Sequence, residues 1–151
     1  MPRLSVDTQF GRLTLVEDEG AITAVRWNGT DAGAPTELLK EAAQQLAEYD
    51  AGRRESFDLP LTVRGSAFQQ DVCAAMRAIP FGETVTYGDI ARDLGAMPQA
   101  VGQACGGNPI PIIIPCHRVM GAKGLTGFSG AGGIETKVAL LRHEGAAGLL
   151  I

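Results

Sequence analysis

The sequence predicts a small α/β unit over residues 1–62, made of an antiparallel sheet plus one helix, followed by a mainly helical unit over residues 63–151 that contains a helix-turn-helix. Three observations support this fold class. Apolar residues alternate along residues 4–27, one amphipathic helix follows them, and beyond residue 63 the apolar residues recur at helical spacing. The chain has 151 residues, of which 45% are hydrophobic and 20% charged, as is typical of a globular protein with one or two small domains.

The first unit begins with strands. Residues 4–27 alternate loosely between apolar and polar side chains, with Gly11 and Gly20 at turn positions, which predicts an antiparallel meander. Thr36 is a candidate helix N-cap, because residues 38–49 that follow it carry apolar side chains on one helical face. Residues 57–63 indicate an extended linker that leads to the second unit.

The second unit contains several helix starts. Ser66 and Gln69 have the S-x-x-Q form of a capping box, and Thr86 with Asp89 makes a second start of this kind. The helix after Thr86 is expected to end at Gly95, and another helix is expected from about residue 98 to 105. Two short helices joined by a tight turn are typical of a DNA-binding helix-turn-helix, although the same spacing is common in cores that bind nothing.

Charge does not by itself indicate a nucleic-acid partner. Thirteen basic and 17 acidic residues give a formal net charge of −4, which argues against a polyanion as ligand. The charge is uneven, since the residues up to 62 sum to −5 and those from 63 onward sum to +1. The second helix of the pair has no Lys or Arg, which disfavours a major-groove reader and favours a minor-groove contact based on shape.

The cysteines indicate a reducing compartment. Cys73, Cys105 and Cys116 form no C-x-x-C pair and are odd in number, so we expect neither a disulfide framework nor a metal site. The first residues have no apolar signal region, and the most apolar run, residues 109–116, is too short for a membrane span. The expected location is the cytoplasm, without contact to a membrane.

The sharpest chemical feature is the segment Pro115-Cys116-His117-Arg118-Val119. A thiol attacks as its thiolate, and a neighbouring imidazole and cation lower the pKa of that thiol from about 8.5 into a useful range. The residues alone fit two interpretations. Cys116 is either a reactive nucleophile or a buried structural cysteine beside a chance histidine.

This segment resembles one known family. Residues 64–146, with NPIPIIIPCHRV at their centre, strongly resemble the O6-alkylguanine-DNA alkyltransferases. The resemblance implies an α/β N-terminal domain followed by a mainly helical winged helix-turn-helix domain. It also implies direct, irreversible transfer of an alkyl group from guanine O6, and less well from thymine O4, to a cysteine after base flipping. No cofactor is expected, and the partner would be double-stranded DNA bound by a monomer through the minor groove.

The resemblance assigns roles residue by residue. The catalytic residues would be Cys116 as acceptor, His117 as base oriented by Glu144, and Tyr87 as proton donor. The substrate pocket would be formed or supported by Asn108, Pro111, Arg118, Ser129 and Gly130. The DNA-binding helix would present Gln99, Ala100, Val101 and Gly102. Gln99 stands where the family has an arginine that fills the stack vacated by the flipped nucleotide.

Three other functions fit parts of this pattern. A non-catalytic lesion-binding protein would lack the acceptor thiol, whereas Cys116 is present. A winged-helix regulator would not need Tyr87, His117 and Glu144 together. A cysteine hydrolase would turn over many times, whereas an alkyltransferase would gain one alkyl group and stop.

Overall fold

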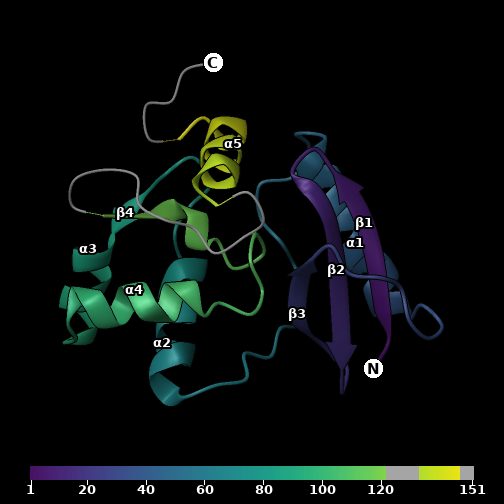
Figure 1. Cartoon of the computed structure of the whole chain (residues 1–151), viewed down its shortest axis with the longest axis horizontal. Helices are drawn as coiled ribbons and strands as arrows, with labels where there is room; N and C mark the ends of the chain where they lie inside the picture. The colour runs from purple at the N-terminus through teal and green to yellow at the C-terminus, as the bar shows by residue number, and fades with distance from the viewer. Residues whose placement is uncertain (122–132, 147–151) are drawn as a thin grey trace. The chain divides into compact units, whose positions relative to one another are not determined.

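The computed structural model describes residues 1–121 and 133–146. The chain divides into two compact units, Met1–Arg64 and Gly65–Ile151 (Figure 1). The first is a three-stranded sheet with one helix and the second is mainly helical, so the predicted fold class is confirmed. No helix in the described part of the chain has the length and apolar character needed to cross a membrane.

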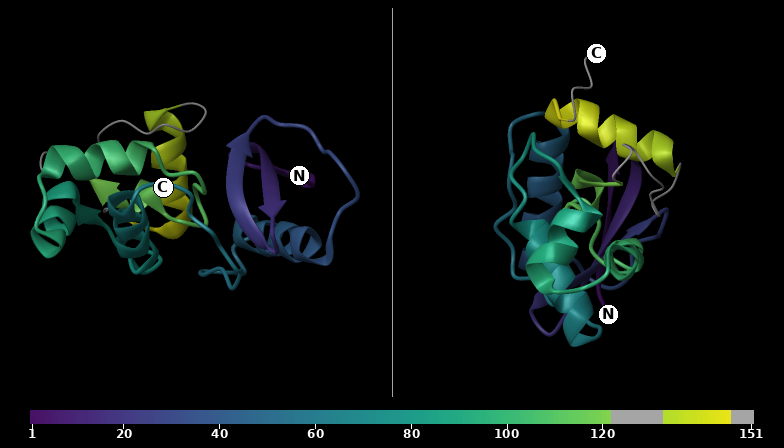
Figure 2. Two further views of the ribbon diagram at one scale, coloured as in Figure 1. Left: turned by 90° about the horizontal axis from the view of Figure 1, so that it is seen from below. Right: turned by 90° about the vertical axis from the view of Figure 1, so that its left-hand side faces the viewer.

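The sheet of the first unit is antiparallel. Its strands are β1 (Arg3–Thr8), β2 (Gly11–Asp18) and β3 (Ala21–Trp27), in the order β1-β2-β3. Gly11 and Gly20 both have positive φ at the two tight connections, as the meander requires. Helix α1 (Glu37–Asp50) begins at Thr36, whose side chain caps it, and runs along the sheet (Figure 2). Apolar residues of α1, β2 and β3 form most of the core of this unit.

The prediction that residues 57–63 form an extended linker is wrong in part, because this segment forms hydrogen bonds with the sheet of the first unit. The Ile22 amide donates to the Pro60 carbonyl at 2.9 Å, and the Thr62 amide donates to the Ile22 carbonyl at 3.0 Å. This segment therefore lies beside β3 and adds to its hydrogen bonds. The physical reason is burial, because Leu59 is only 6% exposed and joins the core of the first unit.

Helices dominate the second unit. Helix α2 (Ala67–Arg77) precedes the short strand β4 (Val85–Thr86), and α3 (Tyr87–Leu94) and α4 (Pro98–Gly106) form the helix-turn-helix. Thr86 and Asp89 make a complete capping box on α3, and Gly95 ends this helix in the left-handed conformation with φ 66°. The predicted helix pair is confirmed. Helix α4 packs on both α2 and α3.

The start of α2 departs from the prediction. Ser66 caps the helix by accepting a hydrogen bond from the Gln69 amide at 3.0 Å, as expected. The Gln69 side chain does not return to Ser66. Its amide donates to the Ala104 carbonyl on α4 at 2.8 Å and to the Cys73 sulfur at 3.5 Å. A tertiary contact between α2 and α4 has replaced the second half of the capping box.

A two-stranded sheet connects the helix-turn-helix to the cysteine motif. Strand β5 (Val119–Met120) follows the 3-10 helix η1 (Cys116–Arg118) and pairs in parallel with β4. Val119 lies opposite Val85, and Met120 opposite Thr86. Tyr87 comes directly after β4. The pairing therefore holds the start of α3 next to the segment that carries Cys116. The last helix, α5 (Ile134–Glu144), packs against η1.

Candidate active site

Two tight turns lead the chain into Cys116. The Ile113 amide donates to the Pro111 carbonyl at 2.9 Å, with Ile112 between them at φ 72°. A β-branched residue in this left-handed region is strained. A second tight turn follows, in which the Cys116 amide donates to the Ile114 carbonyl at 2.8 Å and Pro115 between them has a negative φ of −81°. Strain of this kind persists only where surrounding contacts hold it.

The Asn108 side chain provides those contacts. Its amide nitrogen donates to the Ile114 carbonyl at 2.8 Å, and its oxygen accepts from the Ile110 amide at 3.0 Å. One side chain thereby joins both ends of the strained loop. The role predicted for Asn108, support of the turn, is consistent with this geometry.

Replacing Asn108 with alanine is expected to destabilise this loop. The variant loses two hydrogen bonds, which predicts a fall of about 2 kcal/mol in the free energy of unfolding. Urea unfolding of the variant and the wild type measures the difference. Gln44→Ala, which removes an exposed amide on α1, is the matched control and should change the free energy of unfolding much less. An Asn108→Ala variant as stable as the wild type would contradict the support of this loop by Asn108.

Cys116 is buried at the start of η1. Burial raises the pKa of its thiol, because an apolar environment disfavours the thiolate. Two neighbours act in the opposite direction, namely a hydrogen bond from the Asn108 side chain and the positive charge of Lys137. Burial is the larger effect, so the surroundings of Cys116 favour the neutral thiol over the thiolate.

The side chain of His117 follows Cys116 directly in the chain and is held by Glu144. Its ring is fully buried, and Nε2 lies 2.7 Å from the Glu144 carboxylate. A carboxylate accepts hydrogen bonds, so Nε2 carries the proton and Nδ1 keeps a lone pair. Within the described residues, Nδ1 is buried without a hydrogen-bond partner. Burial lowers the pKa of His117 and favours the neutral ring. The hydrogen bond and the charge of Glu144 raise this pKa, but burial has the larger effect.

Glu144 also binds Arg118. The Arg118 Nε and Nη2 atoms donate to the two oxygens of this carboxylate at 2.8 and 3.1 Å. Nη1 of Arg118 donates to the Ile79 carbonyl at 2.6 Å. The buried carboxylate is thus compensated by a buried guanidinium, and both hold the histidine ring in one orientation.

Lys137 is a site residue that the sequence analysis missed. It is only 1% exposed, and its ammonium group donates to the Val119 carbonyl at 2.7 Å. The same nitrogen lies 6.0 Å from the centre of the Tyr87 ring. A usable signal was present, because Lys137, Leu140, Leu141 and Glu144 have the i, i+3, i+4, i+7 spacing of a buried helix face.

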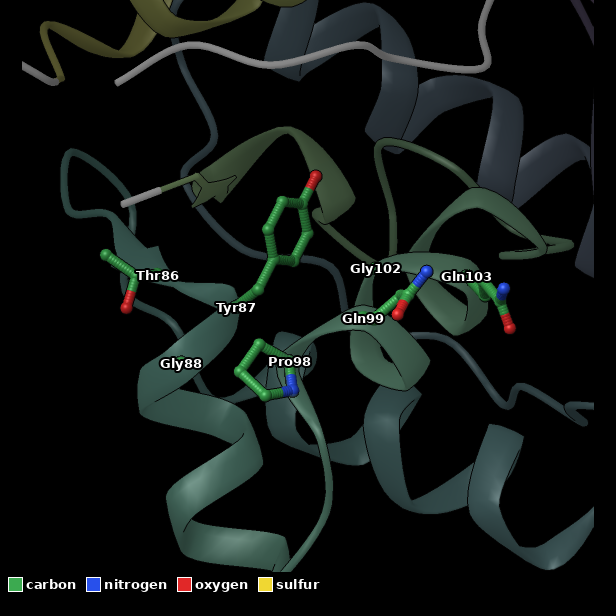
Figure 3. A pocket seen from close by; sticks show the side chains of 7 residues that line it. All are labelled: Thr86, Tyr87, Gly88, Pro98, Gln99, Gly102 and Gln103. Carbon is green, nitrogen blue, oxygen red and sulfur yellow. The ribbon is translucent and has the colours of Figure 1, made fainter. Parts of the chain in front are cut away.

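A groove lies between the start of α3 and helix α4. It has a volume of about 560 Å³. Figure 3 shows Tyr87 rising from the start of α3, with Pro98, Gln99 and Gln103 contributed by α4. Tyr87 and Gln99, which the resemblance assigned to different steps, line this same groove together with Gly102.

The other predicted residues have different positions. Cys116, Asn108 and Arg118 are not among the described residues that line the groove, and Pro111 is buried within the strained loop. Val101 is fully buried on α4, so its side chain packs in the core and anchors the helix. The predicted pocket residues Ser129 and Gly130 lie outside the described residues.

The two remaining cysteines are structural. Cys73 and Cys105 are free thiols buried on α2 and α4. Burial, with a smaller contribution from Cys116 and Cys73, raises the pKa of Cys105 to about 12, so this thiol is unreactive at neutral pH. Among residues 1–121 and 133–146, no three His, Cys, Asp or Glu side chains gather as a metal-binding group.

Comparison with known proteins identifies relatives of both units. Residues 4–63 match the ribonuclease-like domain of 6-O-methylguanine DNA methyltransferase, and residues 67–146 match its DNA binding domain. The methylated-DNA–protein-cysteine methyltransferase of Mycolicibacterium paratuberculosis is 41% identical, with 93% of this chain and 90% of the relative covered. The constitutive enzyme of Bacillus subtilis is 42% identical over 93% of both chains.

Solved structures agree with these matches. The O6-methylguanine methyltransferase of Mycobacterium tuberculosis superposes with a TM-score of 0.84 at 42% identity, covering 95% of this chain and 92% of the other. A second structure from that organism, an OGT in complex with DNA, gives a TM-score of 0.83 at 43% identity, covering 93% and 91%.

Proposed function

This chain belongs to the family of methylated-DNA–protein-cysteine methyltransferases, and from this premise we propose that Cys116 takes the alkyl group directly from O6 of a damaged guanine in DNA. DNA alkyl repair is the activity of that family. The observation that carries the assignment of residues is the buried arrangement of Cys116, His117 and Glu144, in which Nδ1 of the histidine has no partner among the described residues.

The first step makes the thiolate. The neutral His117 ring, oriented by Glu144, accepts the Cys116 proton at Nδ1, either directly or through a water molecule. General-base assistance of this kind contributes roughly 10²–10⁴-fold to a rate. The positive charge of Lys137 and the Asn108 hydrogen bond stabilise the resulting thiolate, because both lower the pKa of the thiol against the effect of burial.

The second step moves the alkyl group. The thiolate sulfur forms a bond to the alkyl carbon as the bond from that carbon to guanine O6 breaks, and the electron pair leaves with the purine. Tyr87 donates a proton to the departing base, and the proton taken from Cys116 returns to solvent or to Tyr87. The thioether product has no leaving group that water can displace, so each protein molecule reacts once. The residues described here need no cofactor for these steps.

The lesion reaches the thiol by base flipping. A guanine inside a duplex is not accessible to a buried cysteine, and extrusion costs a few kcal/mol, less for a mispaired base. The composition of α4 supports binding at the minor groove of the DNA. This helix carries no charged side chain that could reach base edges in the major groove. In this arrangement Gln99 occupies the gap that the flipped nucleotide leaves.

Gln99→Arg is expected to speed alkyl transfer from duplex DNA by roughly fivefold to tenfold, because a charged guanidinium binds the orphaned base and phosphates more strongly than a neutral amide. Transfer from single-stranded DNA should not change, since no base needs to be extruded. Single-turnover rates on both substrates measure the effect. Gln44→Arg, an exposed position on α1, controls for added charge; an unchanged duplex rate in the Gln99 variant would refute the flipping role.

One experiment tests the proposed function as a whole. The protein is incubated with an excess of duplex oligonucleotide containing O6-methylguanine, and intact mass and peptide mapping are recorded over time. We expect a gain of one methyl group per molecule, located on the peptide that contains Cys116. Repeated turnover, or binding without an adduct, would overturn the proposal.

The cysteines also bear on the compartment in which the protein would act. Three free thiols, one of them the alkyl acceptor, function only where thiols stay reduced, which supports the cytoplasm. We propose that a single copy acts on each lesion, because the acceptor, the base and the proton donor all come from one chain.

A further inference from the structure

Gln103 lines the groove beside Tyr87 and Gln99, and nothing in the chemistry above uses it. It is exposed on α4 and lies one helical turn after Gln99 (Figure 3). Residues at i and i+4 are neighbours on a helix surface, so the two amides face the same side. Within the described residues, neither side chain makes a hydrogen bond to the protein. Both amides are available to a ligand in the groove.

The surface next to these amides is open. Gly102 also lines the groove, and a Cβ atom placed on it would meet no described atom outside its own stretch of helix within 4 Å. Glycine weakens a helix interior relative to alanine, and packing inside the protein does not require it here. The missing side chain leaves room for a ligand backbone to approach α4 closely.

The chemistry of an amide suits one feature of the minor groove. Every base pair presents acceptors there, whereas only a G·C pair adds a donor, the guanine 2-amino group. The NH₂ of a glutamine donates to any of these acceptors, but its oxygen accepts only from that amino group. A glutamine in the minor groove therefore distinguishes G·C from A·T pairs, without the salt dependence of a charged contact.

We propose that Gln103 reads a base pair beside the lesion and gives the protein a preference for G·C there. The inference rests on the proposed function, in which Gln99 fills the vacated stack and α4 lies in the minor groove. Four residues of helix advance about 6 Å, which is close to two base-pair steps of about 3.4 Å. Gln103 then lies over the pairs within two steps of the flipped nucleotide.

The test uses single-turnover transfer from duplexes that differ only at these pairs. O6-methylguanine is flanked by G·C, by A·T, or by inosine·C, which lacks the 2-amino group but is otherwise like G·C. We expect the wild type to react roughly fivefold faster beside G·C than beside inosine·C, the size of one neutral hydrogen bond. Gln103→Leu should erase this ratio and keep the protein folded, because the side chain is exposed.

The controls separate the two proposals. Gln44→Leu on α1 removes an exposed amide elsewhere and should keep the wild-type ratio. Equal wild-type rates beside G·C and inosine·C, or an unchanged ratio in Gln103→Leu, would overturn the role of Gln103 while alkyl transfer itself proceeds. Absence of transfer from every duplex and from single-stranded DNA would instead overturn the proposed function, and with it this inference.

Discussion

Replacing Cys116 with serine is expected to abolish methyl uptake from O6-methylguanine DNA. A hydroxyl has nearly the volume of a thiol, so the variant should fold, but serine is a much weaker nucleophile at neutral pH. His117 and Glu144 remain in place and cannot accept the methyl group in its stead. Intact-mass measurement after incubation with the modified duplex should show no adduct, while binding to that duplex persists.

Cys73→Ser provides the matched control. Cys73 is also buried in the second unit, and its sulfur accepts a hydrogen bond from Gln69. The same substitution there should leave methyl uptake at one group per molecule. If Cys116→Ser still acquired a methyl group, or if Cys73→Ser lost the adduct while remaining folded, Cys116 would not be the acceptor.

Replacing Glu144 with alanine is expected to have the largest effect on stability. Its carboxylate is the shared partner of His117 and Arg118, and Arg118 is only 6% exposed. Removing one partner of a buried ion pair leaves an uncompensated charge and costs about 3–5 kcal/mol. Denaturant unfolding should show this loss, and the variant is expected to be unfolded in part at physiological temperature.

Glu144→Gln tests the catalytic role with the side-chain volume kept, and like Glu144→Ala it removes the counter-charge of Arg118. A glutamine amide can donate to Nε2 of His117, which moves the ring proton to Nδ1 and removes the acceptor for the Cys116 thiol. Loss of general-base assistance predicts a fall of about 10²-fold or more in the rate of transfer. The matched control is Glu135→Gln, an exposed position on the same helix, which should keep the wild-type rate. A folded Glu144→Gln variant with an unchanged rate would exclude the proposed role of the Glu144 carboxylate in orienting His117.

The sequence predicted those parts of the fold that depend on neighbouring residues. The meander follows from alternation and two turn glycines, and the helix starts at Thr36 and Thr86 follow from capping side chains that bond within their own first turn. The end of α3 at Gly95 is equally local. These contacts span three to five residues, so they are visible in the order of the residues.

Contacts between distant residues were not predictable in this way. Gln69 was expected to complete a local capping box but bonds to Ala104, 35 residues away. Residues 57–63 were expected to be a linker but lie beside β3, because burial of Leu59 outweighs exposure of the segment. A side chain with several possible partners takes the one that the whole fold brings close, and no short pattern records that choice.

The sequence by itself determined the fold class, the helix-turn-helix and the identity of the cysteine motif, since each depends on residue types within a short stretch. The resemblance already paired His117 with Glu144, but only the tertiary structure showed that this pair is buried together with Arg118 and that Lys137 is buried on the same helix as Glu144. His117 and Glu144 are 27 residues apart in the chain, and Lys137 and Val119 are 18 apart. Packing of α5 against η1 joins both pairs in an apolar interior, where each charge acts strongly because water does not screen it.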